Sequence, residues 1–336
     1  MIKEFMDQLE KKEDLDFHSM QSAIEFIMTG EVDDLSIEKF LLALNEKGIS
    51  EKEITAAAIV MKEKSLTFNI GNGDHIDTCG TGGSGLNTFN CSTASSFVAA
   101  AGGALVAKHG NKAVSSKSGS ADLLIAAGAD ITHDREKIET IFDRVGFVFL
   151  FAPLHHQSMK YVMPARQKIG KKTLCNLLGP HTNPCGAKKQ ILGVYEKELV
   201  KSRAAVATNL SMEHVLIVHG FDGLDEITIT NKTYVAELKD NSINDYEISP
   251  KDFGLNFGQL SEIIAQSSDD SLQLIREAFS GEKSAVQDMI ALNSGAALYL
   301  ANVVHSIADG VEISFELMNN GMAADKLASY VRVSNS

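Results

Sequence analysis

Residues 77–94, DTCGTGGSGLNTFNCSTA, hold four glycines within six positions and decide the fold class of this chain. Glycines let a backbone turn tightly and approach a bound anion closely, and we expect a helix to begin near Ser92, directly after the loop. The start of a helix offers unpaired N–H groups and a partial positive charge. The segment therefore predicts a strand, a phosphate-binding loop and a helix in succession. The alternative is a tight strand-to-helix turn without a ligand.

Two further features of this loop bear on that choice. Thr81, Asn87 and Thr93 add uncharged hydrogen-bonding groups around the glycines, which favours a binding loop over a bare turn. The stretch is neither a Walker loop, because no Gly-Lys-Ser/Thr follows, nor a dinucleotide fingerprint of the G-x-G-x-x-G type. We therefore expect a phosphate site of another class.

From residue 74 onward, short apolar runs alternate with helical stretches, which indicates an α/β domain with a mainly parallel central sheet. We expect strands at residues 104–107, 147–151, 190–194 and 215–218, helices at residues 120–127 and 199–210, a long apolar helix at 285–304 and a final amphipathic helix at 315–331. Ligands of such sheets bind beyond the carboxyl ends of the strands. The loops that follow the strands are therefore where we expect the chemistry.

The first 65 residues have apolar side chains at helical spacing and predict a small bundle of about four helices. Ser50 and Glu53 form a capping-box pattern at the start of one helix, while Gly30 and Gly48 stand where helices would end. The predicted fold class is thus α/β, with a helical domain at residues 1–70 and a catalytic domain at residues 74–336. A Gly- and Pro-rich segment at residues 171–189 is expected to cross between them.

Composition excludes several classes of protein. The 336 residues exceed the usual size of one hydrophobic core, so two domains are expected. The formal net charge of -13 disfavours nucleic acid as a partner. The longest apolar run, residues 97–107, is too short to cross a bilayer, and the four cysteines contain no C-x-x-C pair. We expect a cytoplasmic protein with reduced thiols and no membrane partner.

A second stretch, residues 106–122 (VAKHGNKAVSSKSGSAD), follows a predicted strand and brings three cations close together in an acidic chain. These cations are Lys108, Lys112 and Lys117. Small hydrogen-bonding residues lie between and beside them: Gly110, Asn111, Ser115, Ser116, Ser118, Gly119 and Ser120. A charge run is usually a solvated loop, but this mixture favours a second anion contact at the same sheet edge.

Six segments resemble, in order, those of the anthranilate phosphoribosyltransferases, the pentosyltransferases of tryptophan biosynthesis. They are GTGG (80–83), NTFNCSTA (87–94), KHGNKAVSSKSGSAD (108–122), FLFAPLHHQSMKYVMPARQ (149–167), NLLGPHTNP (176–184) and GLDEIT (223–228). The resemblance implies a helical domain, an α/β domain of the nucleoside-phosphorylase type, and a homodimer formed through the helical domains. It also implies Mg²⁺ as cofactor and transfer of a phosphoribosyl group from phosphoribosyl pyrophosphate to anthranilate.

Site residues follow from the same resemblance, position by position. Those implied for phosphoribosyl pyrophosphate are Gly80, Thr81, Gly82, Gly83, Thr88, Asn90, Ser92, Thr93, Lys108, Asn111, Lys112 and Ser120. Those implied for anthranilate are Gly80, His109, Asn111, His156, Arg166 and Gly179, and those for the metal are Ser92, Asp225 and Glu226. Arg166 would meet the anthranilate carboxylate, for which a planar guanidinium is the right shape. His109 is a candidate general base, as is the pyrophosphate itself.

The chain departs from the family pattern at two positions, and two rival functions stay open. Ser84 stands where the family usually has Asp, so an acidic group beside the metal is missing, and Lys112 stands where Arg is usual. One rival is a nucleoside phosphorylase of the same fold. The other is a noncatalytic nucleotide-binding member of the family, for which Ser84 is the supporting feature.

Overall fold

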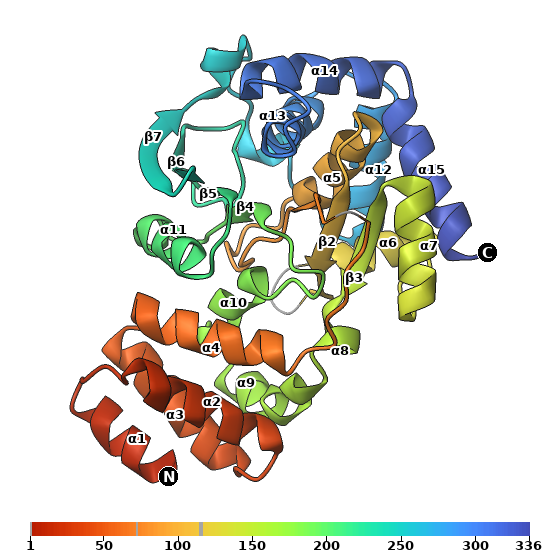
Figure 1. The fold of residues 1–336 in the computed structure, drawn as a ribbon. Coiled ribbons are helices and arrows are strands. Elements are labelled where there is room, and N and C mark those ends of the chain that lie inside the picture. The colour runs from red at the N-terminus through yellow and green to blue at the C-terminus, as the bar shows by residue number, and fades with distance from the viewer. Residues whose placement is uncertain (1, 72, 114–116) are drawn as a thin grey trace.

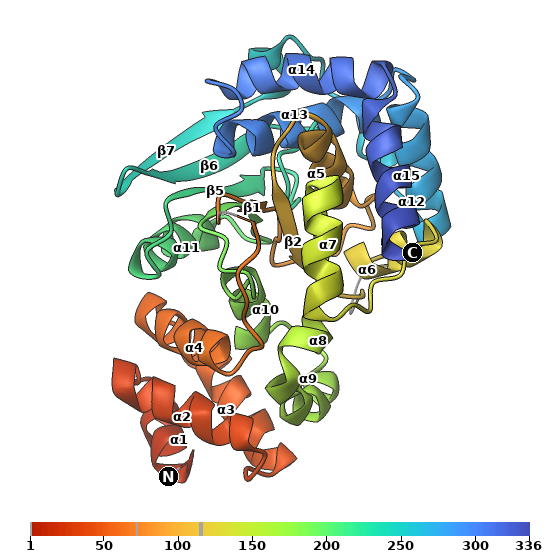
Figure 2. The ribbon, with the colours of Figure 1, turned by 45° about the vertical axis from the view of Figure 1, so that its right-hand side comes forward.

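The protein was analysed as a computed structural model, which describes residues 2–71, 73–113 and 117–336. Figure 1 shows a group of N-terminal helices at one end of the molecule and a sheet with its covering helices at the other. The two chain termini lie in different parts, because the C-terminal helix belongs to the sheet end (Figures 1 and 2). None of the described helices is both long enough and apolar enough to span a bilayer.

Four helices form the N-terminal bundle, as the sequence predicts: α1 (Ile2–Glu10), α2 (Phe17–Thr29), α3 (Asp34–Lys47) and α4 (Glu51–Glu63). The capping box at the start of α4 is confirmed, since the Glu53 N–H donates to Ser50 Oγ and the Ser50 N–H donates to Glu53 Oε2. Gly30 and Gly48 follow α2 and α3 with φ of 83° and 89°, which a residue with a Cβ rarely adopts.

The described residues form a sheet of seven strands in the order β3-β2-β1-β4-β5-β6-β7. Their bounds are β1 (Ile76–Asp77), β2 (Val106–Gly110), β3 (Phe147–Phe151), β4 (Lys189–Gly193), β5 (His214–Gly220), β6 (Thr233–Lys239) and β7 (Ser242–Ile248). The first five strands are parallel, and β6 and β7 extend the sheet antiparallel to them. The carboxyl ends of β1, β2 and β4 therefore meet at one edge.

Helices cover the sheet and close two hydrophobic cores. The larger core contains residues from strands β1 to β6 and from the helices packed on them, and a smaller core packs α11 (Glu198–Asn209) against β4, β5 and β6. The helices of this part are α5 (Cys91–Ala101), α6 (Ser120–Ala126), α7 (Arg135–Val145), α8 (Ala152–His155), α11 (Glu198–Asn209), α12 (Ser268–Phe279), α13 (Ala285–Leu300), α14 (Ile307–Asn319) and α15 (Met322–Ser334). Short 3₁₀ turns occur at Gln157–Tyr161, Gly179–His181, Pro250–Phe253 and Leu260–Glu262.

Part of the crossing segment packs with the bundle. The core of α1–α4 also buries Leu174 and Leu178 of α10 (Leu174–Leu178), together with Val162 directly before α9 (Met163–Ile169). Figure 2 shows α10 between the N-terminal helices and the sheet, and α9 beside the N-terminal helices, below α8. The region between the bundle and the sheet is therefore built from segments that lie far apart in the sequence.

Three predicted elements need correction. The strand predicted at residues 104–107 is Val106–Gly110, so Lys108 and His109 lie in a strand and not in a loop. The long apolar helix ends at Leu300 instead of residue 304. The single final helix predicted at residues 315–331 is two helices, because Gly321 adopts φ of 85° between α14 and α15. Strands β6 and β7 were not predicted, and β7 is mostly exposed, with no fully buried residue.

Candidate active site

The glycine-rich loop connects β1 to α5 at the meeting edge of the sheet. Gly82, Gly83 and Gly85 adopt φ of 62°, 85° and 76°, a region that strains residues with a Cβ. The loop ends where α5 begins at Cys91. The predicted succession of strand, loop and helix is therefore the observed one.

Gly193, the last residue of β4, supports this loop and the acidic loop after β5 at once. Its carbonyl oxygen accepts a hydrogen bond from the Thr81 N–H at 2.8 Å. A β-carbon on Gly193 would lie 1.7 Å from the carbonyl oxygen of Asp225, and one on Gly80 would lie 3.0 Å from the carbonyl oxygen of Gly193. The two loops are thus in backbone contact through one residue that has no side chain.

Lys108 occupies the centre of the edge and is buried, with 1% of its surface exposed. Its Nζ donates to the Thr78 carbonyl oxygen at 3.1 Å, to Thr78 Oγ1 at 2.9 Å and to Ser92 Oγ at 3.2 Å. Lys108 is the middle residue of β2, and β2 lies next to β1. Its side chain therefore reaches the start of the loop that follows β1. Lys108 therefore ties the loop to the first turn of α5.

The acidic pair Asp225 and Glu226 faces the glycine-rich loop across a small cavity. The residues lining the cavity are Thr78, Gly80, Ser92, Ser95, Ile191, Gly193, Asp225, Glu226 and Asn293. Burial and the neighbouring Asp225 raise the pKa of Glu226 to about 8, while Lys108 and the Ser92 N–H oppose the rise. Burial also raises the pKa of Asp225, against a hydrogen bond from the Ser84 side chain. Two carboxyl groups thus share one cavity and lack a full countercharge.

Polar side chains near the start of α5 form a second group. Asn90 Oδ1 accepts hydrogen bonds from Ser118 Oγ at 2.7 Å and from Ser271 Oγ at 2.8 Å, and Asn90 Nδ2 donates to the Ser118 carbonyl at 3.2 Å. Ser120 begins α6 directly after Gly119 and is partly exposed. The structure therefore brings Asn90 together with Ser118, two positions before Ser120.

The other residues predicted for phosphate differ in their surroundings. Asn111, Lys112 and Lys117 are exposed beyond the end of β2. Thr93 is fully buried in α5, and Thr88 pairs with Ile264 in an isolated antiparallel bridge. Ser115 and Ser116, two of the predicted small donors of the basic segment, lie outside the described residues.

Two of the residues predicted for the acceptor, His109 and His156, lie side by side. The rings of His109 and His156 lie 5.1 Å apart between centroids, and both side chains are buried. Burial, His156 and His155 hold the pKa of His109 well below its ordinary range, and a backbone contact from Gly179 opposes the shift. Burial likewise lowers the pKa of His156 to about 4. Both imidazoles are therefore neutral at pH 7.

Arg166 lies apart from this histidine group, on α9 at the bundle side of the junction. Its side chain is partly exposed, and its positive charge acts on the buried Cys175 thiol of α10.

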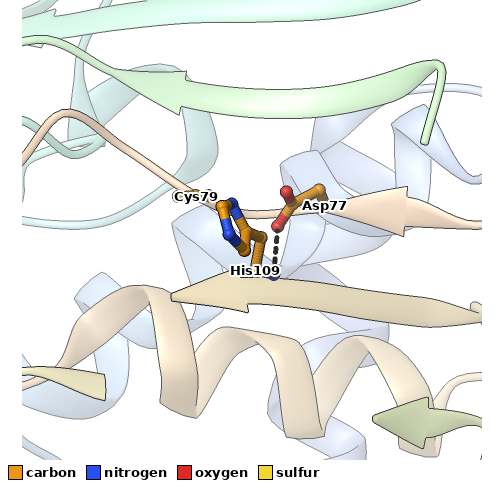
Figure 3. A group of neighbouring side chains, drawn as sticks. All are labelled: Asp77, Cys79 and His109. Atoms are coloured by element: carbon orange, nitrogen blue, oxygen red, sulfur yellow. Dashed lines mark hydrogen bonds between the residues drawn. The ribbon is translucent and has the colours of Figure 1, made fainter. Parts of the chain in front are cut away.

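Asp77, Cys79 and His109 place three metal-ligand atoms within 4.8 Å of one another (Figure 3). The carboxylate of Asp77 is already occupied, however. It accepts the N–H groups of Thr78 at 2.7 Å and His109 at 3.1 Å, and the amide of Asn183 at 2.8 Å. These bonds hold β1, β2 and the crossing segment together, so we interpret this cluster as a structural carboxylate.

The sequence analysis did not identify Asp77, Asn183, Gln190 and Asn293. These residues position the site, but they form no local sequence pattern. Gln190 Nε2 donates to the carbonyls of Cys79 at 3.2 Å and Pro180 at 2.7 Å. Asn293 of α13 bonds both the N–H and the carbonyl of Ile227, at 3.0 and 2.8 Å, and so fixes the acidic loop. For Asn293, the available sequence signal was a polar residue inside an otherwise apolar helix.

Comparison with known proteins first gives the class. Two family models of one glycosyl transferase family match the chain, the helical bundle domain at residues 3–65 and the a/b domain at residues 72–324. These matches agree with the bundle, the sheet and the loop-lined cavity described above.

Relatives then give the particular family. The anthranilate phosphoribosyltransferase of Ruthia magnifica is 46% identical over 99% of this chain and 98% of its own. The crystal structure of the Thermus thermophilus enzyme of that name matches with a TM-score of 0.92 and 34% identity, over 98% of this chain and 99% of its own. The Saccharomyces cerevisiae enzyme in complex with PRPP and Mg matches with a TM-score of 0.91 and 26% identity, over 99% and 98%. The chain belongs to the anthranilate phosphoribosyltransferase family.

Proposed function

We propose that the protein transfers the phosphoribosyl group of phosphoribosyl pyrophosphate to anthranilate, giving N-(5-phosphoribosyl)anthranilate and pyrophosphate. The carrying observation is the cavity in which the glycine-rich loop and the first turn of α5 face the pair Asp225 and Glu226. Loop N–H groups and a helix start suit the anionic end of the substrate. The acidic pair suits a cation that bridges protein and pyrophosphate.

The residues of the cavity fit Mg²⁺. All candidate ligands are oxygen atoms, and the raised pKa values of Asp225 and Glu226 reveal negative charge that the protein alone does not balance. In this proposal Ser92, Asp225 and Glu226 hold the metal, which would neutralise charge on the leaving pyrophosphate. The hydrogen bond from Ser84 reaches Asp225 where a third carboxylate is usual in the family.

The remaining phosphate contacts follow the polar groups of the two loops. Gly80–Gly83 and Thr81 would bind the pyrophosphate through backbone N–H groups, with Lys108 holding the loop in position. Asn90, Thr93, Ser120 and the exposed Lys112 would meet the ribose phosphate beside α6. The network of Asn90 with Ser118 and Ser271 supports this division, because it orients one amide at the start of α5.

The chemical step exchanges one bond at C1 of the ribose. The C1–oxygen bond to pyrophosphate breaks, a bond from C1 to the anthranilate nitrogen forms, and one proton leaves that nitrogen. Arg166 and Asn111 would orient the acceptor. The neutral state of His109 supports it as the proton acceptor, and a weak base suffices because an arylammonium group is acidic.

The assembly and compartment belong to the same proposal. A homodimer through the helical bundle is supported by Leu35, which is 51% exposed on α3, and by Phe5 and Met6, which are only half-buried on α1. A cytoplasmic location is supported by four cysteines that form no disulfide. Light scattering on the purified protein tests the dimer, and a monomeric mass at micromolar concentration would refute it.

Anthranilate fluorescence provides the test of function. Mixing the protein with anthranilate, phosphoribosyl pyrophosphate and Mg²⁺ should consume the fluorescence, and a chelator should stop its loss. Arg166→Met should raise the KM for anthranilate with little change in the KM for phosphoribosyl pyrophosphate. Persistent fluorescence at high enzyme concentration would rule out the proposed reaction.

A further inference from the structure

We propose that Lys172 is a further binding residue for the diphosphate end of phosphoribosyl pyrophosphate, and that the ring of Tyr195 holds its ammonium group until the diphosphate arrives. The inference deepens the proposed function and rests on it. Lys172 lies between α9 and α10, in the segment that crosses from the bundle to the sheet.

The aliphatic part of Lys172 lies directly on the glycine-rich loop. Its Cε would be 3.1 Å and its Cδ 3.7 Å from a β-carbon placed on Gly83. Gly83 is one of the loop residues at positive φ, so its missing side chain leaves the room that the lysine stem fills. The side chain is partly buried in this position.

The charged end of Lys172 has only a weak and exchangeable partner. Its Nζ lies 3.5 Å from the centroid of the Tyr195 ring, on the loop that follows β4. The same charge acts on Asp225, where it is among the groups that oppose the rise of that pKa caused by burial. A cation–π contact at a partly exposed ring is weaker than a charge-assisted hydrogen bond to a phosphate oxygen. The ammonium group therefore gains by changing partner when a diphosphate is present.

The cavity itself needs such a cation. None of the described residues that line it is a Lys or an Arg. Lys108 stands next to it, but its Nζ has three donor protons and three oxygen partners already, Thr78 O, Thr78 Oγ1 and Ser92 Oγ. Lys172 is the lysine whose stem contacts the loop and whose charge is not committed to a protein oxygen in the described structure.

Lys172 also connects the site to the helical bundle. Its carbonyl oxygen accepts a hydrogen bond from Asn45 Nδ2 of α3 at 2.6 Å. A cation fixed to the bundle by its backbone and to the substrate by its side chain would hold the bundle against the sheet edge while the diphosphate is bound.

The test compares Lys172→Met with Lys171→Met, a neighbouring lysine that is exposed. We expect Lys172→Met to raise both the KM for phosphoribosyl pyrophosphate and the dissociation constant of Mg²⁺-pyrophosphate about tenfold, the usual effect of losing one charged hydrogen bond. The KM for anthranilate and the melting temperature should stay unchanged. Lys171→Met should match the wild type, and Lys172→Arg should restore most of the affinity.

Tyr195→Leu separates substrate binding from a purely structural contact. If Tyr195 only holds the free lysine, its loss leaves pyrophosphate affinity equal to or tighter than that of the wild type. Weakening of pyrophosphate by Tyr195→Leu as strong as that by Lys172→Met would overturn the proposal, as would equal behaviour of Lys172→Met and Lys171→Met. Calorimetric pyrophosphate binding needs no anthranilate turnover, so failure of the proposed reaction would be recognised separately.

Discussion

The helical bundle contains a fully buried glutamate and the carboxyl edge of the sheet a partly buried one, and the two differ in how their charge is balanced. Glu53 of α4 has no exposed surface and accepts hydrogen bonds from the Leu15 N–H, the Ser50 N–H and Lys47 Nζ. Glu226 has Asp225 beside it, and its pKa rises to about 8. A complete set of partners marks a carboxylate that serves folding, whereas the incomplete set at Glu226 is consistent with its role in the proposed metal site.

Removing the charge at the sheet edge should give the largest effect. Glu226→Gln is expected to lower kcat/KM about a thousandfold, since metal-held charge stabilisation contributes several kcal/mol. Because the variant loses a poorly balanced charge, the melting temperature of the metal-free protein should stay level or rise. Steady-state kinetics at pH 8 check the loss of activity, and thermal unfolding at pH 8 checks the melting temperature. A variant that keeps its activity would remove Glu226 from the metal site.

Removing the charge of Glu53 in the bundle should lower the stability of the protein and leave its catalysis intact. Glu53→Gln is expected to cost about 3 kcal/mol of unfolding free energy, because Lys47, whose side chain is 2% exposed, loses one of its two acidic partners. Catalysis at low temperature should persist, since Glu53 lies far from the cavity in the fold. Urea unfolding together with activity at a temperature below the transition measures this. Loss of activity without loss of stability would contradict the assignment.

The pH dependence of Mg²⁺ binding sharpens the comparison. Glu226 has a folded-state pKa of about 8 against an ordinary value of 4.5, so its ionisation works against folding as pH rises through that window in the metal-free protein. At pH values below that pKa, Mg²⁺ in the proposed metal site has to displace the proton of Glu226. The dissociation constant of Mg²⁺ should therefore fall about fifteenfold between about pH 6.5 and pH 8. Calorimetry should also record proton release, and a pH-independent constant would contradict the raised pKa.

The smallest expected effect concerns Ser84. Ser84→Asp places a third carboxylate beside Asp225, so Mg²⁺ should bind a few-fold more tightly, about 1 kcal/mol, while the metal-free protein should become slightly less stable. Ser84→Ala is the matched control and should weaken Mg²⁺ binding modestly, because the hydroxyl bond to Asp225 is lost. Equal Mg²⁺ affinity in all three proteins would show that position 84 does not reach the metal.

Local features of the fold could be predicted from the sequence, and long-range ones could not. The capping box of Ser50 and Glu53 is a four-residue pattern, and both of its hydrogen bonds are present. The break at Gly321 was also local, in the sequence MNNGM, and a longer apolar pattern across it led to the wrong single helix. The hairpin of β6 and β7 stayed hidden because β7 has almost no buried side chains.

The same division applies to the site. Lys108 and the glycines were singled out because they lie in dense motifs, and the resemblance to the family supplied Asn90, Asp225 and Glu226. The role of each as a ligand stays a prediction. Asn293 and Lys172 reach the site from segments far away in the chain, and their pairing with Ile227 and Gly83 depends on the folded backbone. No single-sequence pattern contains that information.

Gly193 has a consequence for how such a protein can vary. Its carbonyl holds the Thr81 N–H, and its α-carbon lies against the backbone of Asp225 with no room for a β-carbon. Any side chain introduced at Gly193, whether in evolution or in a mutant library, would displace the acidic loop, the glycine-rich loop or both. The two loops are therefore not separate modules: a change in the length or path of one is accepted only with a compensating change in the other.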